Sequence, residues 1–216
     1  MACLKAGFML TVLAALLVTM APSALAQHGH GGSPTRYESE DRDQWQLPEK
    51  VVALLEIKEG MTVADIGSSS GYFSRRFSAA VGSSGHVLAV DLDKKALQWL
   101  AAKAKELGLG NIKTILAEPD NPHLPNQKVD LVFFCNTLHH IGNRIGYLEE
   151  LKGSLAPGAR VAVVDFLKKE LPVGPRDIDH KLSRRKAYNA IREAGYRVLR
   201  EPQGLPYQYF IIARPE

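Results

Sequence analysis

A short run of small residues between an apolar strand and a helix is the part of this chain best suited to hold a ligand. The run is Asp65–Gly71, with glycine at both Gly67 and Gly71. Tiny residues at the carboxyl end of a strand let a ligand approach the backbone closely. Asp91 ends the next apolar strand, twenty residues after Gly71, and offers two acceptor oxygens to a ribose diol. Together these features indicate a pocket for a cofactor that contains adenosine.

The acidic residue two positions before Gly67 narrows the choice of cofactor. In dinucleotide-binding folds the first turn and helix bind a pyrophosphate, which a carboxylate at this place would repel. Asp65 suits instead a cofactor that carries a cationic ammonium and a sulfonium.

From about Trp45 to its C-terminus, the chain resembles a class I S-adenosylmethionine-dependent methyltransferase. The family signature acid-x-Gly-x-Gly-x-Gly falls on Asp65, Gly67, Ser69 and Gly71, so serine replaces the middle glycine. This serine narrows the space beside the methionine tail of the cofactor and loses glycine's tolerance of positive φ. The resemblance implies S-adenosyl-L-methionine as cofactor and a small molecule as methyl acceptor.

The resemblance also implies positions for the rest of the cofactor site. It assigns the ribose contact to Asp91 and the edge of the adenine to Glu118, after the third strand. The cofactor-binding residues that it implies are Asp65, Gly67, Ser69, Gly71, Tyr72, Asp91, Leu92, Glu118, Pro119 and Asn136.

Asn136, His139 and His140 follow the fourth strand and are the candidate catalytic residues. Methyl transfer is an in-line displacement that depends on alignment, and it needs a base only where the nucleophile carries a proton. A histidine suits a substrate hydroxyl, because its ordinary pKa of about 6.5 leaves it mostly neutral at pH 7. The alternative is that one imidazole packs against the following helix, since adjacent residues in a turn rarely both face one pocket.

Three further segments could complete the site. Arg42–Pro48 lies where methyltransferases of this type often fold a lid, and Trp45 in it could exclude water or merely staple the first helix. His180 is placed to reach the substrate side, although a surface position is the commoner outcome. Asp165 ends the fifth strand and either points to the pocket or is a neutralised carboxyl at the edge of the core. Residues 206–210 could equally be edge-strand packing.

The distribution of charge and of metal-binding residues excludes other classes of partner. The formal charge of +4 is diffuse, so nucleic acid is not indicated, and the basic cluster around Arg184 is expected to be a solvated helix face. His28 and His30 could chelate a metal only weakly, as part of a polar linker. No other group has the spacing of metal ligands, and the sequence therefore predicts no metal site.

The amino terminus has the composition of a secretory signal. Lys5 precedes the apolar run Phe8–Met20, and Ala24–Ala26 supplies small residues at a cleavage site. We expect a signal peptide over 1–26, a flexible tether over 27–43 and one methyltransferase domain over 44–216. The protein is then exported, to the periplasm, with no stable membrane insertion after cleavage. An uncleaved anchor is the alternative, although the run is short for a membrane span.

Strand and helix patterns alternate through the domain, which predicts a parallel sheet covered on both faces. We expect an α/β fold: a doubly wound, Rossmann-like, mostly parallel sheet of seven strands that ends in an antiparallel hairpin. The expected strands are 62–66, 86–90, 112–117, 129–136, 160–166, 196–200 and 207–213, and the expected helices are 48–57, 72–81, 94–107, 144–155 and one that Ser183 caps and that reaches 194.

Two other functions remain open from the sequence. A nicotinamide-dependent oxidoreductase is disfavoured by Asp65, by the absence of a Gly-x-Gly-x-x-Gly run and by the terminal hairpin. A catalytically inactive S-adenosylmethionine-binding protein is the other alternative, which Ser69 and export away from the cytosol, where the cofactor is made, support. The acceptor and the oligomeric state do not follow from the sequence.

Overall fold

The computed structural model describes residues 37–39 and 41–216. The predicted signal peptide and most of the predicted tether lie outside these residues. The helices are α1 (Arg42–Gln46), α2 (Pro48–Leu55), α3 (Tyr72–Val81), α4 (Lys94–Glu106), α5 (Arg144–Leu151) and α6 (Arg184–Glu193), with 3₁₀ turns η2 (Leu138–His140) and η3 (Lys152–Ser154). The strands are β1 (Thr62–Ile66), β2 (His86–Asp91), β3 (Ile112–Leu116), β4 (Val129–Cys135), β5 (Leu155–Phe166), β6 (Tyr196–Arg200) and β7 (Gln208–Pro215).

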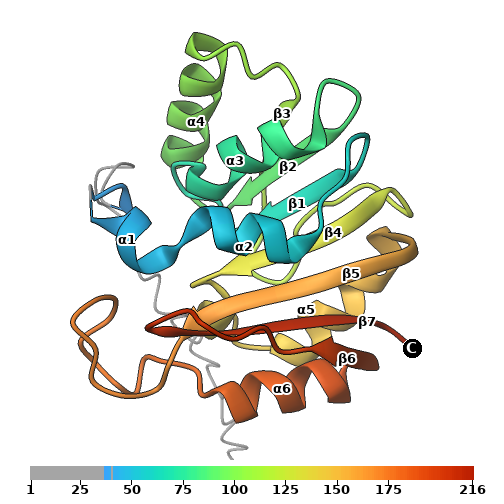
Figure 1. The fold of residues 1–216 in the computed structure, drawn as a ribbon. Helices are drawn as coiled ribbons and strands as arrows, with labels where there is room; N and C mark the ends of the chain where they lie inside the picture. The colour runs from blue at the N-terminus through green and yellow to red at the C-terminus, as the bar shows by residue number, and fades with distance from the viewer. Residues whose placement is uncertain (1–36, 40) are drawn as a thin grey trace, which may run out of the picture. The chain divides into compact units, whose positions relative to one another are not determined.

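The strands form one seven-stranded sheet in the order β3-β2-β1-β4-β5-β7-β6. All pairs from β3 to β5 are parallel, whereas β7 pairs antiparallel with both β5 and β6. The predicted α/β fold with its C-terminal antiparallel hairpin is confirmed. The carboxyl ends of β1 and β4 point to the side of the sheet on which α1 lies, away from the C-terminus (Figure 1).

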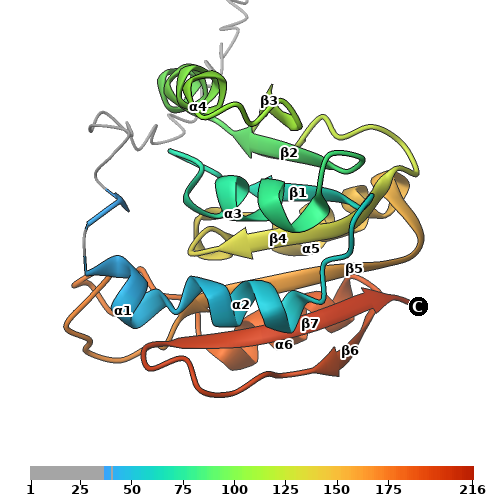
Figure 2. The same ribbon diagram turned by 45° about the horizontal axis from the view of Figure 1, so that its top comes forward.

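Helices cover both faces of the sheet because successive strand side chains point to opposite faces. Val63 packs with Phe73 and Phe77 of α3 and with Leu55 of α2 in one apolar cluster. Ala64 belongs to a second cluster, with α5 and α6. Along β1, Asp65 therefore shares a face with Val63 and points toward α3. Figure 2 shows α1, α2 and α3 on the same face of the sheet.

Side-chain caps begin three helices at the predicted places. Asp93 accepts hydrogen bonds from two backbone amides of α4, Asn143 from one of α5 and Ser183 from one of α6. Each cap satisfies an amide that has no partner within its helix.

The two predicted boundaries around Leu155 are wrong by four and five residues, and several others differ by one or two. The helix expected to reach Leu155 ends at Leu151, and β5 begins at Leu155 rather than at Arg160. Pro157 and Gly158 indicated a turn, but they lie within the strand where its pairing with β4 shifts register between Val129 and Leu131. A bulge tolerates proline because no ladder hydrogen bond is lost there.

The described part of the chain has no helix that is long and apolar enough to cross a membrane. Of the predicted tether, Arg42 and Asp43 belong to α1.

Candidate active site

The turn after β1 has positive φ angles and close neighbours at two positions, both of which are glycine. Gly67 has a φ of +73°, and a Cβ there would lie 2.3 Å from Oγ1 of Thr137. Gly71 has a φ of +79°, and a Cβ there would lie 2.2 Å from Cδ1 of Leu100. Any side chain at either position would therefore displace its neighbours. Ser69 adopts a φ of +49° although it is not glycine, a conformation that costs about 1–2 kcal/mol.

Asp91 ties this turn to the end of β2. Its Oδ2 accepts a hydrogen bond from the amide of Ser69 at 2.7 Å, and its Oδ1 accepts one from the amide of Asp93 at 2.8 Å. Because a carboxylate has about four acceptor sites, each oxygen of Asp91 can also accept a hydroxyl hydrogen. The carboxylate is thus fixed in orientation and suited to a vicinal diol.

Asp65 is an acidic group with little access to water. Its side chain is buried, and burial raises its pKa from the ordinary 3.8 to about 6. The hydroxyl of Ser74 donates to its Oδ2 at 2.6 Å, and this bond and the positive charge of Arg42 oppose the rise. A desolvated carboxylate of this kind favours the approach of a cationic group.

Two hydroxyls in the same turn lack a hydrogen-bond partner among the described residues. Ser68 Oγ and Ser70 Oγ are both buried. A buried polar atom without a partner costs about 1–3 kcal/mol, so such atoms commonly face a ligand or a water. The donor set of the turn, with its close glycines, fits the amino-acid and ribose parts of S-adenosylmethionine.

Helix α1 is held against the start of α3, next to this turn. The guanidinium of Arg42 lies 3.7 Å from the ring centroid of Tyr72, the first residue of α3. Asp43 accepts hydrogen bonds from Arg76 at 2.9 and 3.0 Å and from the Tyr72 hydroxyl. Trp45 packs against Phe166, with ring centroids 5.9 Å apart. The segment predicted as a lid is therefore a short helix held by α3 and by the end of β5.

Hydrogen bonds between side-chain amides link the end of α1 to the residue that follows β4. Gln46 Nε2 donates to Gln208 Oε1 at 2.6 Å, and Gln208 Nε2 donates to Asn136 Oδ1 at 2.7 Å. Asn136 has a positive φ of 54°. Its carbonyl oxygen is thus occupied within the protein, and its amide hydrogens are the groups that it can offer to a ligand.

His139 is held by a buried carboxylate. Its Nδ1 lies 2.8 Å from Asp165 Oδ1 and 3.0 Å from Oδ2, and Asp165 also accepts hydrogen bonds from the amides of His139 and Phe166. Since a carboxylate only accepts, Nδ1 carries a hydrogen, and in the neutral ring the lone pair is on Nε2. Arg144 fixes the η2 backbone by donating to the carbonyls of Leu138 and His139, both at 3.0 Å.

Two exposed histidines join His139 at this edge of the sheet. The ring of His140 lies 4.1 Å from that of His139, and the ring of His180 lies 5.1 Å from His139 and 5.0 Å from His140, between centroids. The two adjacent rings lie side by side, but His139 is buried against Asp165 whereas His140 is exposed. The 3₁₀ turn places both imidazoles beside His180, which comes from the loop between β5 and α6.

Comparisons with known proteins show the family to which the chain belongs. A family model described as a methyltransferase domain matches residues 57–204. The chain belongs to this family. A crystal structure of an S-adenosylmethionine-dependent methyltransferase from Aquifex aeolicus is 30% identical, with a TM-score of 0.79, and the match covers 84% of this chain and 98% of that one.

Other relatives are more distant. The ubiquinone/menaquinone biosynthesis C-methyltransferase UbiE of Citrobacter koseri is 26% identical over 113 residues, which are 52% of this chain and 45% of that protein. The chain thus matches about half the length of this curated relative. The structure of magnesium protoporphyrin IX methyltransferase from Synechocystis PCC 6803 with bound S-adenosylmethionine shares the fold at 18% identity, with a TM-score of 0.59 and 80% of each chain covered.

The cofactor residues implied by the resemblance fall into two groups in this methyltransferase. Asp65, Gly67, Ser69, Gly71 and Asp91 come together at the carboxyl ends of β1 and β2, with Tyr72 beside them. Leu92 and Glu118 are exposed, and Glu118 Oε1 lies 3.5 Å from His123 Nε2. Pro119 follows Glu118 in a loop that the Glu118–Asn121 bridge closes.

Several site residues of the methyltransferase did not follow from sequence reasoning. Gln46 and Gln208 were not singled out, and Arg42 was considered only as part of a lid segment. A polar residue within an apolar strand was the available signal for Gln208, since buried polar groups need partners. Asp165 and His180 were considered separately, but nothing in the sequence indicated that both lie beside His139.

Cys135 lies at the end of β4 but is not a reactive group. Burial raises the pKa of its thiol to about 12, and the thiol lies 3.7 Å from Gln46 Oε1. The thiol therefore stays protonated at neutral pH and is a poor nucleophile or metal ligand.

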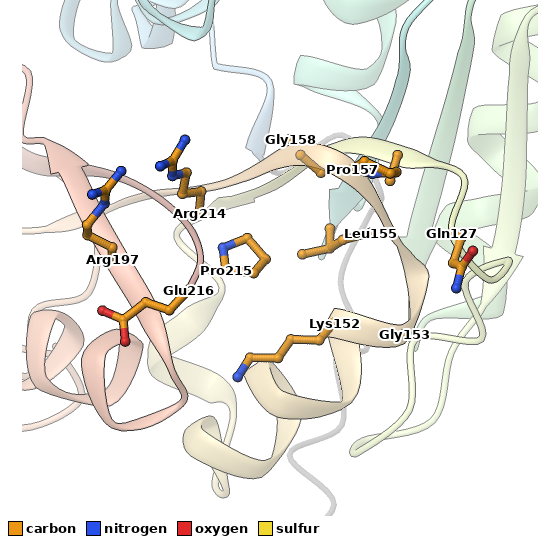
Figure 3. A pocket seen from close by; sticks show the side chains of 12 residues that line it. Gln127, Lys152, Gly153, Leu155, Pro157, Gly158, Arg197, Arg214, Pro215 and Glu216 are labelled. Carbon is orange, nitrogen blue, oxygen red and sulfur yellow. The ribbon is translucent and has the colours of Figure 1, made fainter.

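An open hollow of about 770 Å³ lies at the opposite edge of the sheet. Figure 3 shows Arg197 at the start of β6 and Arg214 and Glu216 at the end of β7 on one side of this hollow, with Lys152 across from them. In an open α/β sheet, ligands bind at the carboxyl ends of the parallel strands, whereas this hollow adjoins the amino end of β5. Its lining holds no histidine, cysteine or buried carboxylate, so we place the active site at the other edge.

Proposed function

We propose that this protein binds S-adenosyl-L-methionine and transfers its methyl group to a small molecule whose nucleophile must first lose a proton. The observation that carries the proposal is the pairing of His139 with buried Asp165, beside the glycine turn. Binding of S-adenosylmethionine alone does not require a histidine paired with a carboxylate. A histidine whose tautomer is fixed by a carboxylate is the arrangement used to accept a proton from a hydroxyl.

The residues of the turn hold the cofactor in this proposal. Asp65 pairs with the ammonium of the cofactor and Asp91 with its ribose hydroxyls. Arg42, whose positive charge acts on Asp65, is the candidate partner of the cofactor's carboxylate. When bound, S-adenosylmethionine supplies an electrophilic methyl on a sulfonium leaving group, for in-line displacement. The α1 helix and Trp45 exclude water, which strengthens the charge interactions inside the site.

His139 prepares the acceptor. Its Nε2 is buried and has no hydrogen-bond partner among the described residues, and the rings of His140 and His180 lie next to it. Exposed side chains change rotamer within nanoseconds, so these two histidines can admit a ligand. The acceptor hydroxyl gives its proton to Nε2, and Asp165 stabilises the imidazolium that forms. The resulting anion then attacks the methyl carbon.

A hydroxyaromatic acceptor is the class to test first. The similarity to UbiE of Citrobacter koseri, a C-methyltransferase by name, supports an acceptor such as a benzoquinol or naphthoquinol. Loss of the phenolic proton raises the electron density of the ring carbon beside it, so one base can serve attack by either oxygen or carbon. Incubation with radiolabelled methyl donor and a panel of phenols and quinols, followed by product analysis, tests this step.

Calorimetry with S-adenosylhomocysteine separates this proposal from a catalytically inactive binding protein. Binding together with methylation of at least one acceptor supports an enzyme. Binding without turnover on any acceptor of the panel favours the inactive protein. Binding of a dinucleotide in place of S-adenosylhomocysteine would indicate an oxidoreductase instead.

Asp91→Ala should weaken S-adenosylhomocysteine binding about ten- to hundredfold, because two buried hydroxyls lose their partner at a cost of about 1–3 kcal/mol. Calorimetry measures the affinity. Asp93→Ala is the matched control, since Asp93 caps α4 and its loss should lower stability by about 1 kcal/mol without changing affinity. Unchanged affinity in a folded Asp91→Ala protein would refute the ribose assignment.

We also propose that the protein is exported to the periplasm and begins at Gln27 after cleavage. The signal pattern over 1–26 supports this. Cell fractionation followed by amino-terminal sequencing should find the abundant form outside the cytoplasm, starting at Gln27. Detection of Met1 at the amino terminus of that form would contradict cleavage.

A further inference from the structure

Three histidines that the sequence separates come together at the acceptor side of the site. One ring nitrogen from each of His139, His140 and His180 lies within 4.8 Å of those of the other two. No other group of three histidine, cysteine or acidic side chains with this spacing occurs within residues 37–39 and 41–216. A neutral imidazole has a lone pair on one ring nitrogen, and three such nitrogens at this spacing can bind one metal ion.

The nitrogen that His139 offers is determined by its other contacts. Nδ1 is occupied by Asp165 at 2.8 Å, which leaves Nε2. Nε2 is buried without a hydrogen-bond partner among the described residues, a costly state for a polar atom. A metal-binding histidine almost always donates its second ring N–H to a carboxylate or carbonyl, which fixes the ring and raises its basicity. His139 and Asp165 have this arrangement.

His180 is brought to the cluster by contacts on both sides of it. Lys168 pairs with Asp179 at 3.0 Å, and Lys181 donates to the carbonyl of Lys169 at 2.8 Å. These bonds tie the segment that carries His180 to the chain just after β5. The third imidazole therefore comes from a loop whose ends are fixed.

We propose that His139, His140 and His180 bind one divalent transition metal, with zinc as the ion that fits best. Three histidines and an open fourth position are the ligand set of a catalytic zinc site. Zinc–nitrogen bonds of about 2.0–2.1 Å in a tetrahedron place ligand atoms about 3.4 Å apart, so ring nitrogens that lie up to 4.8 Å apart must approach one another by up to about 1.4 Å. His139, held by Asp165, provides the fixed point of the site.

The role of the ion in methyl transfer rests on the proposed function. An acceptor oxygen bound at the fourth position would lose its proton more readily, because a metal ion lowers the pKa of a bound hydroxyl. Nε2 would then hold the metal rather than take the proton. Metal binding itself does not depend on methyl transfer and is measured without a methyl donor.

The test begins from the full chain with His28→Ala and His30→Ala, which removes the two histidines of the predicted tether as alternative ligands. After treatment with a chelator and dialysis, calorimetry with zinc should give one ion per chain. Cobalt should give the visible absorption of a tetrahedral site. His180→Ala in this parent should weaken zinc binding at least about a hundredfold, and Asp165→Asn about ten- to hundredfold. His86→Ala, an exposed histidine at the start of β2, is the matched control and should bind as the parent does.

Three outcomes overturn the metal site: no zinc binding by the parent, equal binding by parent and His180→Ala, or cobalt binding without the tetrahedral spectrum. Zinc should also raise the melting temperature of the parent but not that of His180→Ala. S-adenosylhomocysteine affinity of the metal-free parent is measured in parallel. If the parent binds zinc but not S-adenosylhomocysteine, the cofactor proposal alone is refuted. If it binds S-adenosylhomocysteine but not zinc, the metal site alone is refuted.

Discussion

His139→Ala should lower methyl transfer to an identified acceptor about 10²- to 10⁴-fold while the affinity for S-adenosylhomocysteine stays near that of the unchanged protein. This is the range typical for loss of a general base. Cofactor binding should persist because the residues that hold the cofactor lie at the ends of β1 and β2, whereas His139 follows β4. Single-turnover kinetics gives the chemical rate, and calorimetry gives the affinity.

The alanine variant leaves Asp165 buried without its imidazole partner, which can cost about 3–5 kcal/mol of stability. His139→Gln addresses this, because its side-chain amide can still donate to Asp165 but has no basic nitrogen. It should fold and show a similar loss of turnover. Asp165→Asn should retain the ring but let it adopt the other tautomer, with a loss of up to about 10⁴-fold.

His140→Ala distinguishes the two roles open to His139. If His139 acts as a base by itself, His140→Ala should retain most of the activity. If the three histidines hold a metal that binds the acceptor, His140→Ala should lose activity to a similar degree and a chelator should inactivate the unchanged protein. Near-full activity in both His139→Gln and Asp165→Asn would show that the site works by alignment and exclusion of water alone.

The elements of the sheet could be predicted from sequence because their signals are local. β1, α3 and β6 have the predicted bounds, since each is an apolar or amphipathic run bounded by glycine or a cap. Helix α1 was not predicted as a helix. It has five residues and is held by tertiary contacts, such as Arg42 on Tyr72 and Gln46 on Gln208, that leave no periodic pattern.

The cofactor site could be predicted further than the acceptor site. Asp65, Gly67 and Gly71 lie in one turn, so their spacing along the chain is also their spacing in the molecule. Asp165 and His180 meet His139 only because β4 and β5 are neighbours and the following loop returns to them. Side-chain direction at a strand end depends on register and turn geometry, which one sequence does not provide. The three-histidine cluster was therefore missed.

Ser69 shows a different limit of prediction from sequence, which concerns the backbone of the turn. The sequence correctly indicated that a non-glycine residue would be disfavoured at the middle of the turn, yet the structure keeps the positive φ that the turn requires. The hydrogen bond from the Ser69 amide to Asp91 helps to offset the cost. Ser69 thus differs from the glycine of the family signature in residue type but keeps a positive φ.

The second large effect concerns Asp65, whose replacement should make the protein more stable while it binds cofactor less well. Burial raises the pKa of Asp65 from 3.8 to about 6, so its ionised form is disfavoured in the folded state. Between pH of about 4 and 6 the folded protein keeps a proton that the unfolded chain has released, and stability falls as pH rises through this window. Above it the full cost, about 3 kcal/mol, remains.

Asp65→Asn removes this cost, because asparagine carries no charge and can still accept the hydrogen bond from Ser74. The free energy of unfolding at pH 7.5, measured without added cofactor, should therefore rise by up to about 3 kcal/mol, and the gain should vanish at pH 4. Other titrating groups are the same in both proteins, so the difference between the two pH values isolates Asp65.

The same variant should weaken S-adenosylhomocysteine binding about tenfold or more, since the ammonium of the cofactor loses a desolvated carboxylate as its partner. Ser74→Ala is the matched control: it removes the hydroxyl that favours the ionised form, so it should lower stability at pH 7.5 while leaving the carboxylate in place. A stability gain of Asp65→Asn that is equal at both pH values would show that burial of charge is not its cause. We thus expect the ionised carboxylate of Asp65 to lower the free energy of unfolding while it strengthens cofactor binding, as in other sites whose function requires a destabilising group.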